Sequence, residues 1–486
     1  MKKDIRVFIA GILFFFVNFS IVSQKARFYE IILTILLLVI LFYCFREYDL
    51  SNIIRPIIIW TSSIIFIYGL FQKYYIFPSI IKHYTTNDSD FSNAFIERVK
   101  TGRIFSIFNL PTLYGIICAI LILYIFHYLR ENFINKNSNL SKNYLGLLLF
   151  TGIYNLVLTQ SFGAIIALAI GLFIYLILEQ IIGIKYLALI VMATSLIIFI
   201  VIGLRYREVK NLEPVKLRLT NWHQAIRMIG NNPFFGVGLG NYATKVSYYT
   251  RQGEARSIYT HNFFLQFTAE VGLPLSILLI LFIFINRKKI VLIDYKKNKL
   301  YIALFAMLLF YNIIDIGFYF IITGIFFSFI LSQIYPKQAK NKKLAISLLL
   351  ICSGLYGLIY LSNNNLTEAN IFLNMNKINK ARNLYEKSIK LNPFNSASIM
   401  GKALTLDKSS NSQKRLELIN KALKISPEYG FALYNKSLIE YKMGHLLSAF
   451  YYAGAAYKKN MLNNNYRKWY EFIKKNLPSR NIIKRD

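Results

Sequence analysis

Long stretches without a charged residue most constrain how this chain can fold. Residues 31–45 and 187–204 are two examples, in a chain of 486 residues of which 55% are hydrophobic. An α-helix rises 1.5 Å per residue, so about 20 apolar residues cross the ~30 Å hydrocarbon core of a bilayer. A soluble chain of this size would alternate core and surface residues instead. The sequence therefore predicts an all-α, polytopic membrane helix bundle.

About eleven membrane spans follow from these stretches, with tight turns at Gln160 and Gly317. The first span has no small-residue cleavage site after it, so it is interpreted as a retained anchor. The predicted spans are residues 5–22, 29–45, 54–71, 104–128, 144–159, 162–182, 186–204, 273–286, 300–316, 318–334 and 343–361.

The distribution of Lys and Arg predicts how the spans are oriented. The net charge is +34, and basic residues favour the cytoplasmic side of a membrane. Clusters in 287–299 and 335–343 place the N-terminus in the cytoplasm and the protein in the cytoplasmic (inner) membrane. The loop 205–272 then lies outside although it has nine Lys and Arg, because the rule weakens in loops this long. Orientation accounts for the positive charge, so no nucleic acid is expected as a partner.

Four regions result from this organisation. Spans occupy 1–204 and 273–361, a long extracytoplasmic loop occupies 205–272, and an extracytoplasmic tail occupies 362–486.

The tail contains a repeat with a period of 34 residues. Pro393 and Pro427 keep this spacing, as do two further sets, Ala381, Arg415 and Ala449, and Ser388, Ala422 and Ala456. The pattern resembles tetratricopeptide repeats, in which small residues let paired helices pack closely. An α-solenoid is therefore expected in the tail. It would serve either as a groove for a protein partner or as a packing platform against the membrane domain.

Several kinds of site are not expected. Cys44, Cys118 and Cys352 all fall within predicted spans and form neither a disulfide framework nor a metal-ligand pattern. The sequence has no HExxH motif and no paired-aspartate motif. We predict a reaction without metal or cofactor. The glycine cluster at 236–240 lacks the Gly-Lys-Ser/Thr of a nucleotide loop, and we interpret it as a site of backbone turning or close chain approach.

The loop 205–272 carries the most specific pattern in the chain. The segment RLTNWHQAIRMIGNNPFFGVGLGNY at 218–242 is followed by THNFFLQFTAEVGLPL at 260–275. Together they resemble the outer-loop signature of the O-antigen ligase and polymerase superfamily. His261, Asn262, Glu270 and Gly272 occupy signature positions, whereas Leu275 replaces a further glycine.

This resemblance implies a glycan transfer from an undecaprenyl-diphosphate carrier to an acceptor hydroxyl. It implies that His261 is the base or the group that positions the acceptor, since histidine titrates near neutral pH. It implies that Arg218 binds the diphosphate, because a guanidinium pairs with phosphate through two hydrogen bonds and stays charged. Asn262 and Glu270 are expected at the substrate site for the same reason.

Further polar residues are candidates for substrate binding. Arg251 and Arg256 precede His261 and would supply a second cation, and Arg103 would supply a third, although basic residues near a membrane also contact lipid headgroups. Asp315 is an acid near the outer end of a span, where charge is costly and commonly functional. Phe162 stands where the superfamily usually has an arginine in its Ser-Arg segment, so one phosphate-binding cation is missing from the sequence pattern.

Three acceptors fit this chemistry. A lipid A core-type acceptor makes the protein an O-antigen ligase, a protein acceptor makes it an O-oligosaccharyltransferase, and a growing glycan makes it a polymerase. Membrane lipids surround the protein in each case. A different class of function, a transporter or a scaffold that presents the tail, is less favoured. No internal symmetry typical of transporters is visible, and a scaffold needs no loop with His and Arg.

Overall fold

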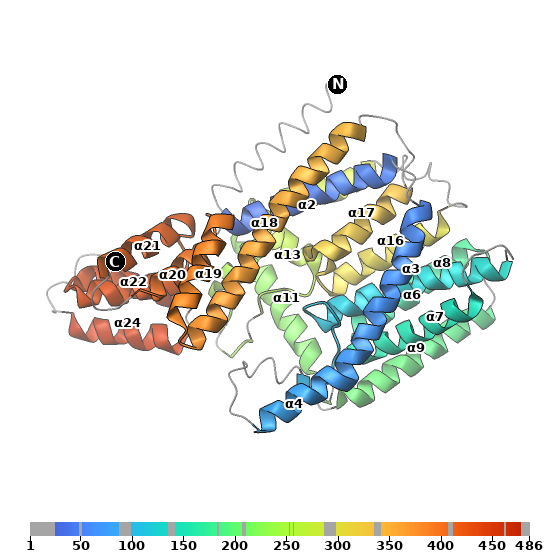
Figure 1. Ribbon diagram of the computed structural model, residues 1–486, viewed down its shortest axis with the longest axis horizontal. Helices are drawn as coiled ribbons and strands as arrows, with labels where there is room; N and C mark the ends of the chain where they lie inside the picture. The colour runs from blue at the N-terminus through green and yellow to red at the C-terminus, as the bar shows by residue number, and fades with distance from the viewer. Residues whose placement is uncertain are drawn as a thin grey trace.

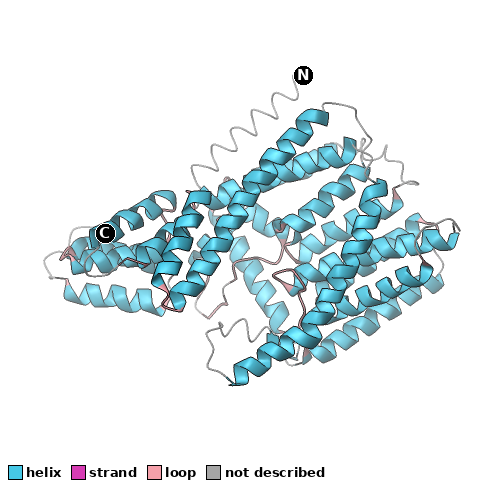
Figure 2. Cartoon of the chain, viewed as in Figure 1, coloured by secondary structure: helices cyan, strands magenta, loops and turns pink. Residues whose placement is uncertain are grey.

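The computed structural model describes most of the chain. The described residues are 25–47, 51–86, 99–134, 141–181, 184–206, 210–251, 253–255, 257–285, 298–334, 342–406, 412–460 and 463–477. These residues form helices, turns and loops and contain no strand (Figure 2), which agrees with the predicted all-α class. The predicted span 5–22 lies outside the described residues.

Each of the other predicted spans coincides with a helix of the bundle (Figure 1). These helices are α2 (Lys25–Glu47), α3 (Ser51–Phe71), α6 (Pro111–Ile134), α7 (Lys142–Thr159), α8 (Phe162–Leu178), α9 (Ile184–Leu204), α14 (Leu273–Ile285), α16 (Lys299–Ile314), α17 (Ile321–Ile334) and α18 (Lys342–Asn374). A π-helical turn, η1 (Gln72–Ile76), and α4 (Phe77–Thr86) continue α3, and η3 (Gly317–Tyr319) precedes α17.

Helix α6 lies at the centre of the bundle. Residues 113–125 are all buried, because α6 packs against α3, α7, α8 and α16. It begins at Pro111, seven residues later than the predicted span, and proline suits a first helical position since it lacks the N–H that would find no partner there. On the other side of the bundle, α2 packs against α17 and α18.

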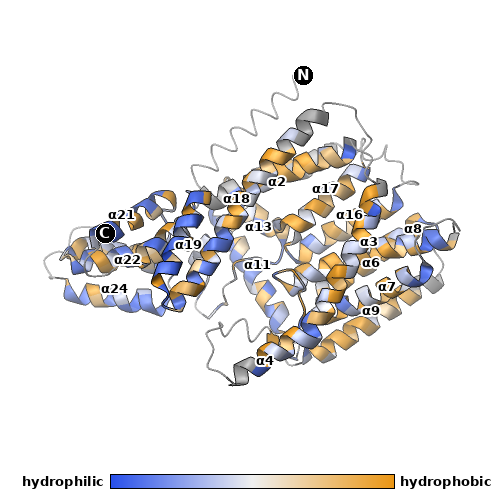
Figure 3. Ribbon diagram, viewed as in Figure 1, coloured by the Kyte–Doolittle hydropathy of each residue, from blue (hydrophilic) through white to orange (hydrophobic). Residues whose placement is uncertain are grey.

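The helices of the bundle consist mostly of apolar residues (Figure 3), and many of these side chains are exposed. Trp60, Ile64 and Ile67 on α3 and Met192 and Phe199 on α9 are each more than half exposed. A soluble protein rarely exposes apolar patches of such extent, whereas a bilayer would cover them. Two described helices, Ile53–Lys82 and Pro111–Phe133, are long and apolar enough to cross a membrane. The total of about eleven spans stays a prediction.

The loop between α9 and α14 folds into its own small helical unit. It comprises α11 (Glu213–Asn231), α12 (Tyr242–Lys245), η2 (Val246–Tyr248) and α13 (Phe263–Val271). Ala225, Met228, Val237, Tyr242, Val246 and Ala269 form its buried core. Since α13 also packs against α16, the unit is held to the bundle at the end of a predicted span.

The tail consists of helices packed in consecutive pairs. After α18 come α19 (Ile378–Leu391), α20 (Ser396–Leu404), α21 (Ser412–Ile425), α22 (Gly430–Lys442), α23 (Leu446–Lys459) and α24 (Asn464–Asn476). The repeat positions fall at matching places in α19, α21 and α23, and all are buried: Ala381, Ser388, Arg415, Ala422, Ala449 and Ala456. Close helix packing thus explains the small residues of the repeat.

Candidate active site

Asp315 joins the two residues that the sequence pattern singled out as catalytic. His261 Nδ1 lies 3.2 Å from Asp315 Oδ1, and Arg218 Nη2 lies 3.9 Å from Asp315 Oδ2. The Asp315 side chain is 4% exposed, whereas those of His261 and Arg218 are about one-third exposed. A buried carboxylate therefore holds an imidazole and a guanidinium that remain accessible.

The ends of three helices position this cluster. Arg218 lies on α11, and Asp315 directly follows α16, where its Oδ1 accepts a hydrogen bond from the Ile316 N–H at 2.9 Å. His261 lies just before α13. The Phe263 N–H donates to the Asp315 carbonyl oxygen at 3.1 Å, so the start of α13 is bonded to the end of α16.

The backbone of His261 is in the left-handed region, with φ +54°. Few residues other than glycine adopt it, and such residues gather at functional sites. Flanking hydrogen bonds fix the turn. Thr260 Oγ1 donates to the Asn262 carbonyl oxygen at 2.6 Å and accepts from the Asn262 N–H at 3.0 Å. Asn262 Oδ1 accepts from the Leu265 N–H and caps α13, so its amide oxygen has a structural use.

Glu270 is a buried structural anchor in this arrangement. Its carboxylate accepts hydrogen bonds from the Gly240 N–H at 2.9 Å, the Tyr242 N–H at 3.4 Å and the Tyr319 hydroxyl at 2.8 Å. Burial raises the pKa of Glu270, and these hydrogen bonds oppose the rise. With 1% of its surface exposed, Glu270 links α13 to the glycine-rich segment and to η3.

The glycine-rich segment lies against the end of α13. The N–H groups of Val237 and Gly238 donate to the carbonyl oxygens of Ala269 and Glu270 at 2.9 and 2.8 Å. Gly236 has φ +64°, and a Cβ there would lie 2.4 Å from the Glu270 carbonyl carbon. The glycines thus permit close chain approach, as the sequence analysis predicted.

Arg251 does not join the cluster. Arg251 is exposed, and its backbone N–H donates to Glu254 Oε2 at 2.9 Å. Arg256 lies outside the described residues. Burial opposes the ionisation of Glu254, but hydrogen bonds from Arg227, Arg251 and Gln224 lower its pKa. This carboxylate therefore ties the segment before His261 to α11.

Two arginines from distant parts of the sequence meet at the turn between α7 and α8. Arg103 Nε donates to the Thr159 carbonyl oxygen at 3.1 Å, and Arg205 Nη1 donates to the Gln160 carbonyl oxygen at 3.4 Å. The Arg205 guanidinium also lies over the Phe162 ring, 5.6 Å from its centroid. Arg205 was not predicted as a site residue from the sequence, although it directly follows the charge-free stretch 187–204.

This turn lies beside the end of α16 that leads to Asp315. A Cβ on Gly163, in the first turn of α8, would lie 3.2 Å from Ile314 Cδ1 and 3.7 Å from Tyr311 Cε2. The Arg205 guanidinium, which lies over the Phe162 ring, is thus a cation close to the position where the sequence pattern predicted an arginine.

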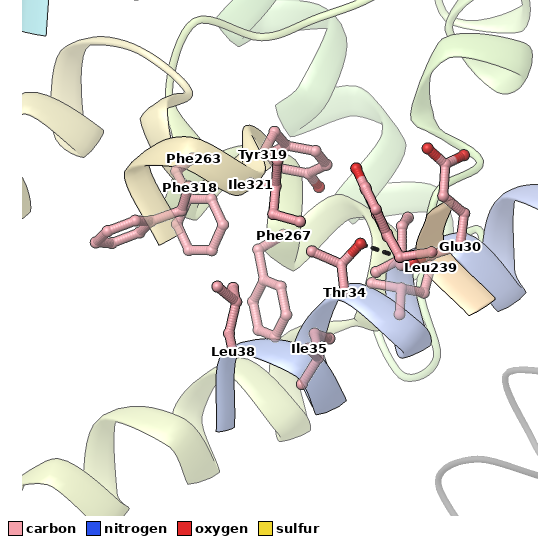
Figure 4. Close-up of a pocket in the computed structure, with 12 residues that line it drawn as sticks. Glu30, Thr34, Ile35, Leu38, Leu239, Phe263, Phe267, Phe318, Tyr319 and Ile321 are labelled. Atoms are coloured by element: carbon pink, nitrogen blue, oxygen red, sulfur yellow. Dashed lines mark hydrogen bonds between the residues drawn. The ribbon is translucent and has the colours of Figure 1, made fainter. Parts of the chain in front are cut away.

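An apolar pocket of about 120 Å³ lies against α13 (Figure 4). Phe263 and Phe267 form one wall, and α2, α17, α18 and the glycine-rich segment contribute the others. The lining residues are Glu30, Ile31, Thr34, Ile35, Leu38, Leu239, Phe263, Phe267, Phe318, Tyr319, Ile321 and Tyr356. Because Phe263 follows His261 by two residues, the polar cluster and the pocket share the start of α13.

Comparison with known proteins gives a match to a family model, which covers part of the chain and includes this region. No curated protein matches the chain. Residues 147–280, which extend from α7 into α14 and include Arg218 and His261, match the family model described as O-antigen ligase.

Proposed function

We propose that this protein transfers a glycan from an undecaprenyl-diphosphate carrier to the hydroxyl of a lipid A core-type acceptor. The reaction takes place on the outer face of the cytoplasmic membrane. The observation that carries the proposal is the contact of Asp315 with both His261 and Arg218. Asp315 contacts one residue that can act as a base, His261, and one that can bind phosphate, Arg218. Both are needed for a glycan transfer in which a proton is removed from the acceptor and a diphosphate is the leaving group.

His261 acts as the base in this proposal. The Asp315 carboxylate can only accept hydrogen bonds, so it takes the Nδ1–H of His261. Nε2 is then the basic nitrogen, and the nearby carboxylate stabilises the imidazolium that forms. The acceptor oxygen bonds to the anomeric carbon of the glycan while the bond from that carbon to the diphosphate oxygen breaks. The hydroxyl proton passes to His261 Nε2.

Arg218 stabilises the leaving group. The electron pair of the broken bond remains on undecaprenyl diphosphate, and a guanidinium in a partly buried site offsets this growing charge. Arg218 is 3.9 Å from Asp315, which is too long for a hydrogen bond and leaves its donors available for phosphate. Arg103 and Arg205 at the α7–α8 turn provide further positive charge for the diphosphate.

The apolar pocket supports a substrate that has a lipid part. It adjoins the start of α13, so a molecule with a polar head near His261 could place an apolar chain against Phe263 and Phe267. Amphiphilic substrates of this kind suit a site between a membrane bundle and an aqueous loop.

The decisive experiment compares His261→Ala and Arg218→Ala with the wild-type protein in cells that lack the natural gene. Expression in the membrane is confirmed by immunoblot, and glycan transfer is followed on gels. Both variants should lose transfer. Wild-type transfer by both would overturn the proposal.

Glycan profiles of the deletion strain decide the acceptor. Loss of glycan-capped lipid core supports the ligase, whereas loss of a glycoprotein supports an O-oligosaccharyltransferase and shortened chains support a polymerase. Normal profiles in all three respects favour a transporter or scaffold. The reaction is proposed to need no metal, so activity of the purified protein that is lost on chelation would contradict that part.

A further inference from the structure

A glutamate of the tail lies between one lysine of the loop 205–272 and one lysine of the tail. Glu428 lies in the turn before α22. Lys245 Nζ, at the end of α12, is 2.6 Å from Glu428 Oε2, and Lys459 Nζ, at the end of α23, is 2.6 Å from Glu428 Oε1. All three side chains are about one-quarter exposed or less.

Neighbouring contacts make this a continuous interface. Ser247 Oγ in η2 donates to the Lys459 carbonyl oxygen at 2.7 Å. Both ammonium groups make cation–π contacts with the Tyr248 ring: the Lys245 Nζ lies 5.8 Å and the Lys459 Nζ lies 5.1 Å from the ring centroid. The tail therefore contacts the loop through charge, a hydrogen bond and an aromatic face.

A short chain of contacts connects this interface with the candidate active site. Lys245 is the last residue of α12 and Tyr242 is the first. The Tyr242 N–H donates to Glu270, which anchors the end of α13. Helix α13 begins directly after His261 and Asn262. A shift of α12 would therefore act on the helix that begins just after the proposed base.

We propose that the tail is an integral part of the transferase and that Glu428 is a positioning residue, which holds α12 and η2 and through them the start of α13. This inference rests on the proposed function. Without Glu428, two lysines would face each other across the interface, and their repulsion would separate α12 from α23. The tail would then remain folded but no longer support the loop.

Hydrogen–deuterium exchange of the full-length protein in detergent tests the coupling without relying on activity. Glu428→Gln is compared with Glu417→Gln, which removes an exposed glutamate from α21 in the same tail. Amides in 236–249 should exchange about 10-fold faster in Glu428→Gln and at the wild-type rate in Glu417→Gln. Equal exchange in the two variants would overturn the proposal.

Transfer kinetics test the consequence for the site. Glu428→Gln should lower kcat by about 5-fold, while Glu417→Gln keeps the wild-type value. Lys245→Met combined with Glu428→Gln should cost less than the sum of the single changes, because the pair acts together. Additive losses would contradict the role of Glu428. If Glu428→Gln exchanges faster but the wild-type protein shows no glycan transfer, the proposed function is refuted and the coupling between the tail and the loop still holds.

Discussion

At the scale of single residues, Asp315 decides how the candidate site is organised. It is the only one of the three clustered side chains that is almost fully buried, and in the proposed mechanism it accepts the Nδ1–H of His261. Asp315 lies outside the segment that matches the O-antigen ligase family. The matched segment includes Arg218 and His261, and the fold brings the Asp315 carboxylate to both.

Replacing Asp315 by Asn should reduce glycan transfer by about 10- to 1,000-fold, because the neutral amide neither stabilises an imidazolium nor fixes the tautomer. Glu213→Gln, which removes an exposed acid at the start of α11, is the matched control and should transfer at the wild-type rate. The measurement is the initial rate in membranes with equal amounts of protein. Wild-type activity of Asp315→Asn would rule out the proposed role.

Glu270 should matter for folding more than for chemistry. Glu270→Ala leaves buried N–H groups and the Tyr319 hydroxyl without their acceptor, so it should cost about 3 kcal/mol of stability. Tyr319→Phe removes one hydrogen bond and should cost about 1 kcal/mol. Thermal unfolding in detergent checks both values. An unchanged midpoint for Glu270→Ala would show that Glu270 is not an anchor.

At the scale of elements, the glycine-rich segment and α13 form one structural unit. Gly236 and Gly272 both have positive φ, and a Cβ at either would lie less than 2.5 Å from a backbone atom of the other segment. The neighbouring atoms belong to the backbone of Glu270 and Phe234, which cannot move aside as easily as a flexible side chain. The two glycines thus set how closely the segment approaches α13.

Gly236→Ala and Gly272→Ala should each destabilise the protein by about 2 kcal/mol, since strained backbone adds to the steric clash. Gly230→Ala is the control, because Gly230 lies in α11 with no atom within 4 Å of the added Cβ. It should be neutral or stabilising by up to about 1 kcal/mol. The unfolding temperatures of the three variants measure these effects. An equal change in unfolding temperature at all three positions would contradict the packing argument.

The turn between α7 and α8 offers a second prediction at this scale. Arg205→Gln should weaken transfer by about 10-fold, because one charge-assisted contact to phosphate is lost. Phe162→Arg added to Arg205→Gln should restore much of the activity, since the new guanidinium starts from the residue that Arg205 covers. Phe162→Arg alone would place two cations together. A double variant no better than Arg205→Gln would show that Arg205 has another role.

At the scale of the whole molecule, α18 connects the bundle and the tail without a break. The predicted boundary at 361 falls within this helix of 33 residues, and α18 packs against α2 at one end and α19 at the other (Figure 1). Together with the Glu428 interface, it gives the tail two separate attachments.

The attachment of the tail to the loop through Glu428 should weaken at acidic pH. Burial opposes ionisation, but the ammonium groups of Lys245 and Lys459 lower the pKa of Glu428, and Tyr248 is the other titratable group that faces it. A lowered carboxyl pKa stabilises the docked state above about pH 4.5, and this contribution is lost as the pH falls through the lower folded-state value. As the pH falls below about 4.5, hydrogen–deuterium exchange of the amides in 236–249 should become faster in the wild type. In Glu428→Gln the exchange of these amides should show no such pH-dependent rise. A rise of equal size in both would contradict the assignment.

The helical class, the positions of the apolar helices and the paired helices of the tail could be predicted from the sequence alone. Local periodicity and short motifs carry this information, since an apolar stretch or a repeat of small residues has the same meaning wherever the chain goes. His261 and Arg218 were predicted as site residues because they belong to one recognisable loop, 205–272.

Only the tertiary structure decided which charges meet. Asp315 touches His261 across 54 positions and Arg218 across 97, and Arg205 reaches a turn that lies 45 positions earlier in the chain. Conversely, Glu270 and Asn262, expected at the substrate, use their oxygens to hold the backbone. A sequence pattern does not encode such differences, because whether a polar group faces substrate or backbone depends on how distant helices pack.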